Sequence, residues 1–128
     1  MTTNKKFTIQ VQAIFEAAHH LRQYHGVPEP IHGHTWKVEV FLIRDGLDHE
    51  GMAIDFLEVK AALDPLIQPF DHHYINEIPP FDKVNPSTEN IASWIFDELN
   101  KKFPTSACKL QKVTLREGPN YSASAESL

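Results

Sequence analysis

The chain has 128 residues, of which 41% are hydrophobic and 23% are charged, and its formal net charge is −5. This length and composition are typical of one globular domain, which we expect to span residues 1–128. The acidic balance argues against a general nucleic-acid-binding protein, and no apolar run approaches the ~20 residues that cross a bilayer. The single cysteine, Cys108, allows no intrachain disulfide. No apolar stretch typical of a secretion signal is visible, so the sequence predicts a cytoplasmic protein without nucleic-acid or membrane partners.

Two long strands with regular alternation open the chain. Residues 5–18 place apolar side chains at every second position, and continuing this alternation puts His19 on the apolar face. A second strand, about residues 33–44, has valine and tryptophan on one face, and His32 and His34 share that face. Three histidines therefore extend the core-facing rows of two strands at adjoining strand ends.

Two amphipathic helices and two further strands follow. Residues 54–70 carry a helical apolar stripe after an aspartate N-cap, although an internal proline must end or kink this helix. Residues 85–103 form a second helix with its own apolar stripe. Residues 109–118 alternate as a third strand, and residues 120–125 could form a short fourth one. This order predicts an α+β fold, with a four-stranded antiparallel sheet and both helices on one face.

The three histidines at the strand ends point to a metal centre. Zinc binds imidazole well, and a catalytic zinc site usually has three protein ligands and an open fourth position. His19, His32 and His34 match that number and type. The alternative is that they are satisfied polar residues at the border of the core, but three of them at one corner favour zinc. The remaining histidines of this half of the chain are expected at surface or solvated positions: His20, His25 and His49.

Six segments occur in the order found in one family: FEAAHHL, IHGHTWKVEV, GMAIDFLEVKAAL, FDHHYIN, NPSTENIASWI and VTLREG. From about Phe7 to Glu117 the sequence resembles the 6-pyruvoyl- and 6-carboxy-tetrahydropterin synthase family. The resemblance implies a tunnelling fold, in which antiparallel sheets of several subunits close into a barrel. It also implies a homohexamer with active sites between subunits, and a small sheet with open edges is consistent with such closure.

The resemblance also assigns catalytic roles to residues of this chain. His19, His32 and His34 match the zinc ligands of the family. Asp71 and His72 match its acid/base pair, in which the histidine moves protons and the aspartate supports it. The alternative for this pair is a polar loop after a helix, because adjacency in sequence does not show that two side chains meet.

Three further residues match the pterin pocket of the family. Glu117 matches the glutamate that anchors the pterin ring, since a carboxylate accepts two parallel hydrogen bonds from an aminopyrimidinone edge. Thr88 and Glu89 match positions near that pocket, although helix capping by Ser87 or Thr88 explains the threonine nearly as well. The residues that hold the substrate phosphates stay open among four cations: Arg22, Lys37, Lys83 and Arg116.

One position departs from the family pattern. The usual members carry a cysteine four residues before the His-Gly-His motif, where this chain has Pro28, and Cys108 is expected to be structural. The nearest replacement is Glu29, three residues before His32. The chain therefore resembles a subgroup with an E-x-x-H-G-H arrangement, which is associated with side-chain cleavage to 6-hydroxymethyl-7,8-dihydropterin, a folate precursor. Partial burial can make a glutamate a useful base, whereas the alternative is a solvated loop residue between two prolines.

The leading prediction is a zinc-dependent lyase that acts on 7,8-dihydroneopterin triphosphate by retro-aldol cleavage, with Glu29 as base. The runner-up is a 6-carboxytetrahydropterin synthase of the queuosine (deazapurine) pathway. A 6-pyruvoyl-tetrahydropterin synthase comes third, because a thiol is expected for it. A catalytically impaired zinc- and pterin-binding protein also stays open: the missing cysteine supports it, and the retained Asp71 and His72 count against it.

Overall fold

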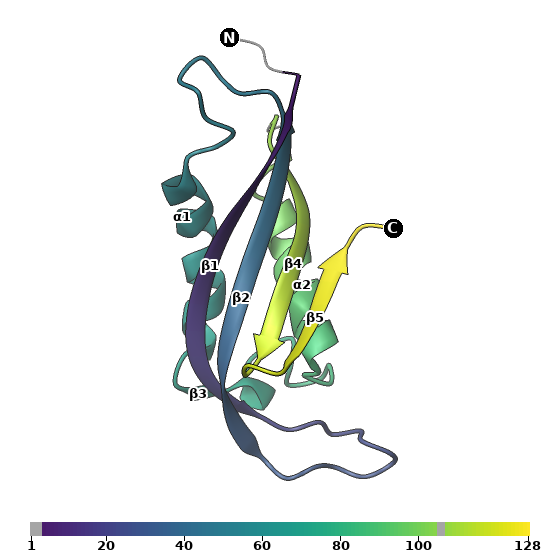
Figure 1. Cartoon of the computed structure of the whole chain (residues 1–128). Coiled ribbons are helices and arrows are strands. Elements are labelled where there is room, and N and C mark those ends of the chain that lie inside the picture. Colours follow the sequence, from purple (N-terminus) through teal and green to yellow (C-terminus); the bar gives the residue numbers. More distant parts are fainter. Residues whose placement is uncertain (1–3, 105–106) are drawn as a thin grey trace.

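The computed structural model describes residues 4–104 and 107–128. Two strands of equal length, β1 (Lys6–His19) and β2 (His32–Asp45), form an antiparallel pair along the long axis of the molecule (Figure 1). Buried side chains alternate with more exposed ones along most of both strands, as the sequence predicted. This pair therefore supplies the apolar face on which the rest of the fold packs.

Across residues 4–104 and 107–128, the sheet has five strands rather than the predicted four. β4 (Lys109–Glu117) pairs with β2, and β5 (Tyr121–Glu126) pairs with β4, both antiparallel, in the order β3-β1-β2-β4-β5. The additional strand, β3 (His73–Tyr74), lies parallel to the end of β1. A two-residue strand is too short for a pattern of its own, and it forms because β1 offers it a free edge.

Helix α1 (Phe56–Ile67) begins at the predicted N-cap, Asp55, whose carboxylate accepts a hydrogen bond from the backbone of the first turn. Pro65 lies inside the last turn, where it has no N–H to donate. The α-helix ends two residues later and continues as a 3₁₀ turn, η1 (Gln68–Phe70).

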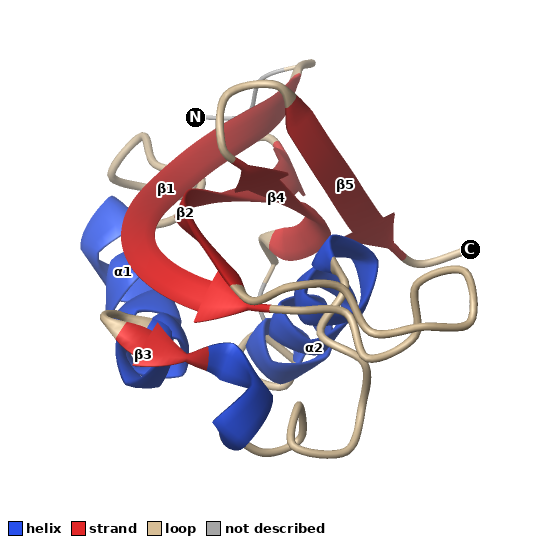
Figure 2. Cartoon of the chain, turned by 90° about the horizontal axis from the view of Figure 1, so that it is seen from below, coloured by secondary structure: helices blue, strands red, loops and turns tan. Residues whose placement is uncertain are grey.

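Helix α2 (Thr88–Asn100) follows a second 3₁₀ turn, η2 (Ile75–Glu77), and its N-cap is Ser87, whose hydroxyl accepts from the Asn90 N–H. The Thr88 hydroxyl is therefore not the cap and is available for another contact. Both helices lie on one face of the sheet (Figures 1 and 2), which confirms the predicted architecture. No helix in the described ranges is long and apolar enough to span a membrane.

The core fills the space between the sheet and the helices. Its Trp36 ring stacks on Phe15 with centroids 6.0 Å apart, and its indole N–H donates to the Ala17 carbonyl at 3.1 Å. The same indole lies edge-on to the His19 ring, with centroids 4.8 Å apart. The apolar core thus extends directly up to the predicted histidine cluster, so one side of that cluster is shielded from water.

Candidate metal centre and active site

Strand register brings the predicted ligands to one end of three neighbouring strands. His19 at the end of β1 is paired with His32 at the start of β2, and His34 lies two residues further along β2 on the same face. On the other side of β2, Trp36 is paired with Glu117, the last residue of β4. These pairings place three imidazoles and one carboxylate on the core-facing side of the same sheet end.

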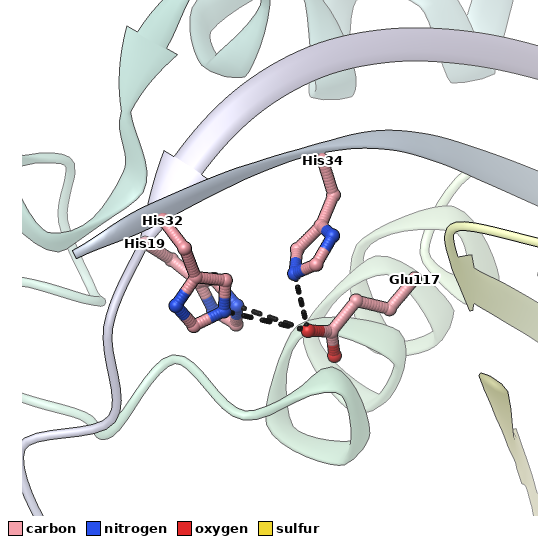
Figure 3. A group of neighbouring side chains, drawn as sticks. All are labelled: His19, His32, His34 and Glu117. Carbon is pink, nitrogen blue, oxygen red and sulfur yellow. Dashed lines mark hydrogen bonds and ion pairs between the residues drawn. The ribbon is translucent and has the colours of Figure 1, made fainter. Parts of the chain in front are cut away.

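The four side chains converge on one point (Figure 3). Glu117 Oε1 lies 2.7 Å from His34 Nε2, 3.4 Å from His19 Nε2 and 3.6 Å from His32 Nε2. All four candidate ligand atoms lie within 4.8 Å of one another. Such a cluster of imidazole nitrogens with one carboxylate oxygen is a donor set that suits a divalent transition metal.

Two backbone carbonyls determine which nitrogen of each imidazole faces the cluster. His19 Nδ1 lies 2.8 Å from the Pro86 carbonyl, and His32 Nδ1 lies 2.9 Å from the Pro30 carbonyl. Because a carbonyl oxygen only accepts, each Nδ1 is the protonated nitrogen of the neutral ring. The lone pair of each Nε2 is then directed at the shared point, which is the arrangement of histidine ligands in metal sites.

His34 supplies an independent indication of a bound ion. Its Nε2 atom is buried and has no hydrogen-bond partner of acceptable geometry within the described part of the chain, although Glu117 is close. A buried polar atom without a partner is costly, and a cation bound to its lone pair would remove that cost. The residues present therefore fit a metal.

Electrostatics in the cluster favour ligands that are ready to bind a cation. Burial lowers the pKa of His19, and the Pro86 carbonyl and Glu117 offset this only in part. Burial by itself raises the pKa of Glu117, but the Thr88 hydroxyl and the neighbouring His19 and His34 outweigh it, so this pKa lies below its ordinary value. Near neutral pH the site thus contains an unprotonated His19 and an ionised carboxylate.

Glu29 reaches the edge of the histidine cluster. Its Oε1 lies 3.8 Å from His32 Nε2 and accepts a hydrogen bond from the Leu21 N–H at 2.9 Å. The backbone N–H of Glu29 also donates to the Leu21 carbonyl at 3.0 Å, so the loop is clamped at this point. The carboxylate is therefore held in place and is not a freely solvated side chain.

Asp71 and His72 form a pair on the surface. His72 Nδ1 lies 3.1 Å from Asp71 Oδ1, and the same oxygen accepts from the Glu16 N–H at 2.9 Å. The Glu16 amide and, to a lesser degree, His72 hold the pKa of Asp71 below its ordinary value. His72 has a positive φ of 61°, a conformation that lets two sequence neighbours meet.

This pair lies at the β1 edge of the sheet, beside the short strand β3. The register of β3 sets His72 beside Glu16, and the two are joined by a backbone hydrogen bond. His72 lines an open hollow to which Thr35 and His34 also contribute, whereas Asp71 is not among the residues that line it. No hydrogen bond or ion pair between described residues joins Asp71 or His72 to the three imidazoles.

Of the two helix residues predicted near the pterin pocket, one contacts Glu117 and the other does not. The Thr88 hydroxyl donates to Glu117 Oε2 at 2.6 Å, whereas Glu89 is exposed in the first turn of α2. Sequence reasoning missed the part played by the Pro86 carbonyl, because a backbone acceptor distant in sequence carries no residue-type signal. It also missed that Arg22, a candidate for phosphate binding, donates to backbone carbonyls instead.

Comparison with known proteins gives the class. The family model described as 6-pyruvoyl tetrahydropterin synthase matches residues 8–127, so the chain belongs to this family and the predicted resemblance is confirmed. The dihydroneopterin monophosphate aldolase of Pyrococcus furiosus is 35% identical over 121 residues, which cover 94% of this chain and 98% of that protein. The 6-carboxy-5,6,7,8-tetrahydropterin synthase of Synechocystis sp. is 38% identical over 92 residues, covering 68% and 70% of the two chains. These relatives are enzymes of pterin chemistry.

Solved structures agree on the fold. The 6-pyruvoyl tetrahydropterin synthase of Caenorhabditis elegans superposes with a TM-score of 0.83 at 22% identity and covers 100% of both chains. A variant of the Plasmodium vivax 6-pyruvoyltetrahydropterin synthase, in which alanine replaces a glutamate described as a catalytic residue, gives a TM-score of 0.77 at 21% identity, covering 96% of this chain and 98% of that one. At these identities the likeness defines the architecture, and the activity has to be argued from the site.

Proposed function

We propose that the chain is a zinc-dependent lyase that cleaves the side chain of a phosphorylated 7,8-dihydroneopterin and leaves 6-hydroxymethyl-7,8-dihydropterin. The observation that carries this proposal is the Glu29 carboxylate at the edge of the histidine cluster, 3.8 Å from His32 Nε2. The Pyrococcus relative named as an aldolase, which matches nearly the whole chain, supports it. Since the product is a folate precursor, we assign the reaction to folate biosynthesis in the cytoplasm.

In this proposal, His19, His32 and His34 hold zinc through their Nε2 atoms. A bound zinc ion would lower the pKa of a substrate hydroxyl that it contacts. The carbonyls of Pro86 and Pro30 keep two of the rings in the required tautomer. Three imidazoles also favour zinc over magnesium or calcium, which prefer sites built mainly from oxygen ligands.

Glu29 is the proposed base. Its carboxylate removes the proton from the hydroxyl on the second side-chain carbon, and the bond between the first and second carbons breaks as that oxygen becomes an aldehyde. The electron pair passes into the pterin C=N bond, and a proton returned to the first carbon completes the hydroxymethyl product. The other product is glycolaldehyde carrying the phosphate. The catalytic glutamate of the Plasmodium vivax enzyme supports a glutamate in such a role.

Glu117, Thr88 and Glu89 are the proposed pterin contacts. Glu117 would accept two hydrogen bonds from the aminopyrimidinone edge, and the Thr88 hydroxyl orients the carboxylate from the other side. Because Glu117 lies beside the imidazoles, a ring bound there has its side chain near the metal ligands. Glu89, in the first turn of α2, would line the entrance to the same pocket.

Asp71 and His72 are proposed to act on the site of a neighbouring copy. Among the described residues no hydrogen bond or ion pair joins them to the three imidazoles, so we assign their role as proton donor and support to the site of a second subunit. This arrangement supports the expected homohexamer with active sites between subunits. His72 is then the group that returns the proton to the first side-chain carbon, and Asp71 orients its ring.

A 6-carboxytetrahydropterin synthase of the queuosine pathway is the second candidate, favoured by the Synechocystis relative. It would use the same ligands and the same pterin anchor and differ in the bond that breaks. The 6-pyruvoyl product ranks third, because Cys108 is buried in the core and no other thiol is present in the sequence. A catalytically impaired binding protein would keep zinc and pterin affinity without turnover.

The deciding experiment is turnover of the zinc-loaded protein with 7,8-dihydroneopterin triphosphate, the predicted substrate, and with the monophosphate named for the Pyrococcus relative. The pterin product is identified by mass. We expect 6-hydroxymethyl-7,8-dihydropterin and a loss of about 100-fold or more in kcat for Glu29→Gln with unchanged zinc content.

Glu50→Gln is the matched control, because Glu50 is an exposed glutamate in the turn after β2, at the end of the sheet away from the histidine cluster. Its kcat should equal that of the wild type. A 6-carboxy or 6-pyruvoyl product would overturn the proposed cleavage, and full activity of Glu29→Gln would remove Glu29 as the base. Zinc and pterin binding without any product would support the impaired binding protein.

A further inference from the structure

Arg22 has an unusual set of partners for an arginine near a proposed active site. Its Nη1 donates to the Val84 carbonyl at 3.1 Å, and its Nη2 donates to the Asn76 carbonyl at 2.9 Å and the Phe81 carbonyl at 2.5 Å. No ion pair with a carboxylate is present among the residues that the structure describes. A planar guanidinium that reaches three carbonyls at once acts as a geometric clamp.

The three carbonyls belong to one segment, residues 76–86, which we call the strap. Two carboxamide side chains of the strap form hydrogen bonds with the backbone directly after β1. The buried Asn76 accepts from the His20 N–H at 3.0 Å and donates to the His20 carbonyl at 2.9 Å. Asn85 accepts from the Arg22 N–H at 2.8 Å. These side chains take the place of a strand partner, so the strap and the chain after β1 hold each other in both directions.

The strap ends at the residue that orients a proposed metal ligand. The carbonyl of Pro86, directly after Asn85, lies 2.8 Å from His19 Nδ1. A displaced strap would move this carbonyl and leave the His19 ring free to rotate or change tautomer. Leu21, directly before Arg22, donates its N–H to Glu29 at 2.9 Å, so the same short stretch also holds the proposed base.

We propose that Arg22 is a positioning residue for the metal centre, acting through the strap and the Pro86 carbonyl on His19. The inference rests on the proposed metal site and adds a residue outside the ligand set. It predicts that the geometry of the guanidinium matters more than its charge, because one ammonium group cannot span three carbonyls.

The test is the zinc affinity of the full-length protein, measured by competition with a chromophoric chelator, for wild type, Arg22→Lys and Asn85→Ala. Loss of a partner behind a metal ligand typically weakens metal binding by about 10- to 100-fold, and we expect Arg22→Lys in that range. The visible spectrum of the cobalt-substituted variant should also change. Arg44→Lys is the matched control, since Arg44 donates to the Ala53 carbonyl near the other end of β2 and should leave both readouts unchanged.

A merely structural role would lower the unfolding temperature of Arg22→Lys and leave zinc affinity and the cobalt spectrum unchanged, which would overturn the inference. If Arg22→Lys does not fold, Asn85→Ala tests the strap itself, because it removes the bond from the Arg22 backbone N–H to the strap. Unchanged zinc affinity and an unchanged cobalt spectrum in Asn85→Ala would also overturn the inference, which requires the strap to position the Pro86 carbonyl. Failure of the metal proposal has a different signature. In that case wild type and His34→Ala bind zinc equally weakly, and both the metal site and the role of Arg22 are refuted.

Discussion

At the ligand-bearing end of the sheet, the core side and the β1 edge are built differently. On the core side, three imidazoles and Glu117 converge against Trp36, and the chain itself supplies the carbonyls that orient two of the rings. At the β1 edge, Asp71 and His72 are paired with each other, with His72 exposed and Asp71 partly exposed. One chain thus assembles a candidate metal centre, whereas the proposed acid/base pair lies at the edge of the sheet, where a second copy would use it.

The largest expected effect is a loss of kcat, and it tests whether Glu29 and His72 act from different subunits. His72→Ala and Glu29→Ala should each lower kcat by about 100- to 10,000-fold, because each removes a group that we propose transfers a proton. If the two groups act from different subunits, refolding the two inactive variants together should restore roughly a quarter of the sites, since mixed assemblies contain intact pairs.

The measurement is the activity of the co-refolded mixture. The control is the activity of each variant refolded alone. No recovery in mixed assemblies, with assembly confirmed by light scattering, would place both groups in one subunit's site. That result would contradict the proposed role of Asp71 and His72 in a neighbouring subunit's site.

An effect of intermediate size is expected for Glu117, which lies beside the imidazoles. This residue is either an anchor for the pterin ring or a fourth metal ligand. In Glu117→Gln we expect pterin affinity to fall by about 10-fold or more, since a charge-assisted pair of hydrogen bonds is lost. Zinc affinity should change little. Pterin binding is measured by fluorescence titration and zinc binding by chelator competition. The reverse pattern, with zinc affinity lost and pterin binding kept, would make Glu117 a metal ligand.

The smallest expected effect is a pH dependence of the metal-free fold. Burial lowers the pKa of His19, so the unfolded chain takes up a proton near its ordinary pKa of about 6.5, whereas the folded chain does so only at lower pH. Stability should therefore fall as pH decreases from about 7.5 to about 5.5. Urea midpoints of wild type and His19→Gln at both pH values provide the measurement, with His49→Gln as an exposed control. An equal pH dependence in wild type and His19→Gln would show that His19 is not its source.

Alternation in the sequence predicted much of this site. The two-residue period of β1 and β2 is enough to place His19, His32 and His34 on one face, because strand geometry alone fixes which side chains share a side. The same period in β4 directed Glu117 inward. Family motifs added Asp71 and His72 as a pair, and the structure brings these two side chains within 3.1 Å of each other.

Local pattern failed where a feature depends on a partner far along the chain. Strand β3 consists of two residues and forms only against the free edge of β1, which explains the missed fifth strand. Arg22 looked like a candidate phosphate ligand, and its actual partners are carbonyls more than fifty residues away. Neither a two-residue strand nor a backbone acceptor produces a periodic or compositional signal.

The sequence by itself therefore determined the fold class, the family and the face on which the three histidines lie, because short-range periodicity and ordered motifs encode these directly. Only the tertiary structure decided which ring nitrogen of His19 faces the cluster, how Glu29 is held, and that Asp71 and His72 pair at the β1 edge. These depend on strand register and on hydrogen bonds to distant backbone groups. Such contacts exist only after the chain has folded, since they join atoms that sequence order does not bring together.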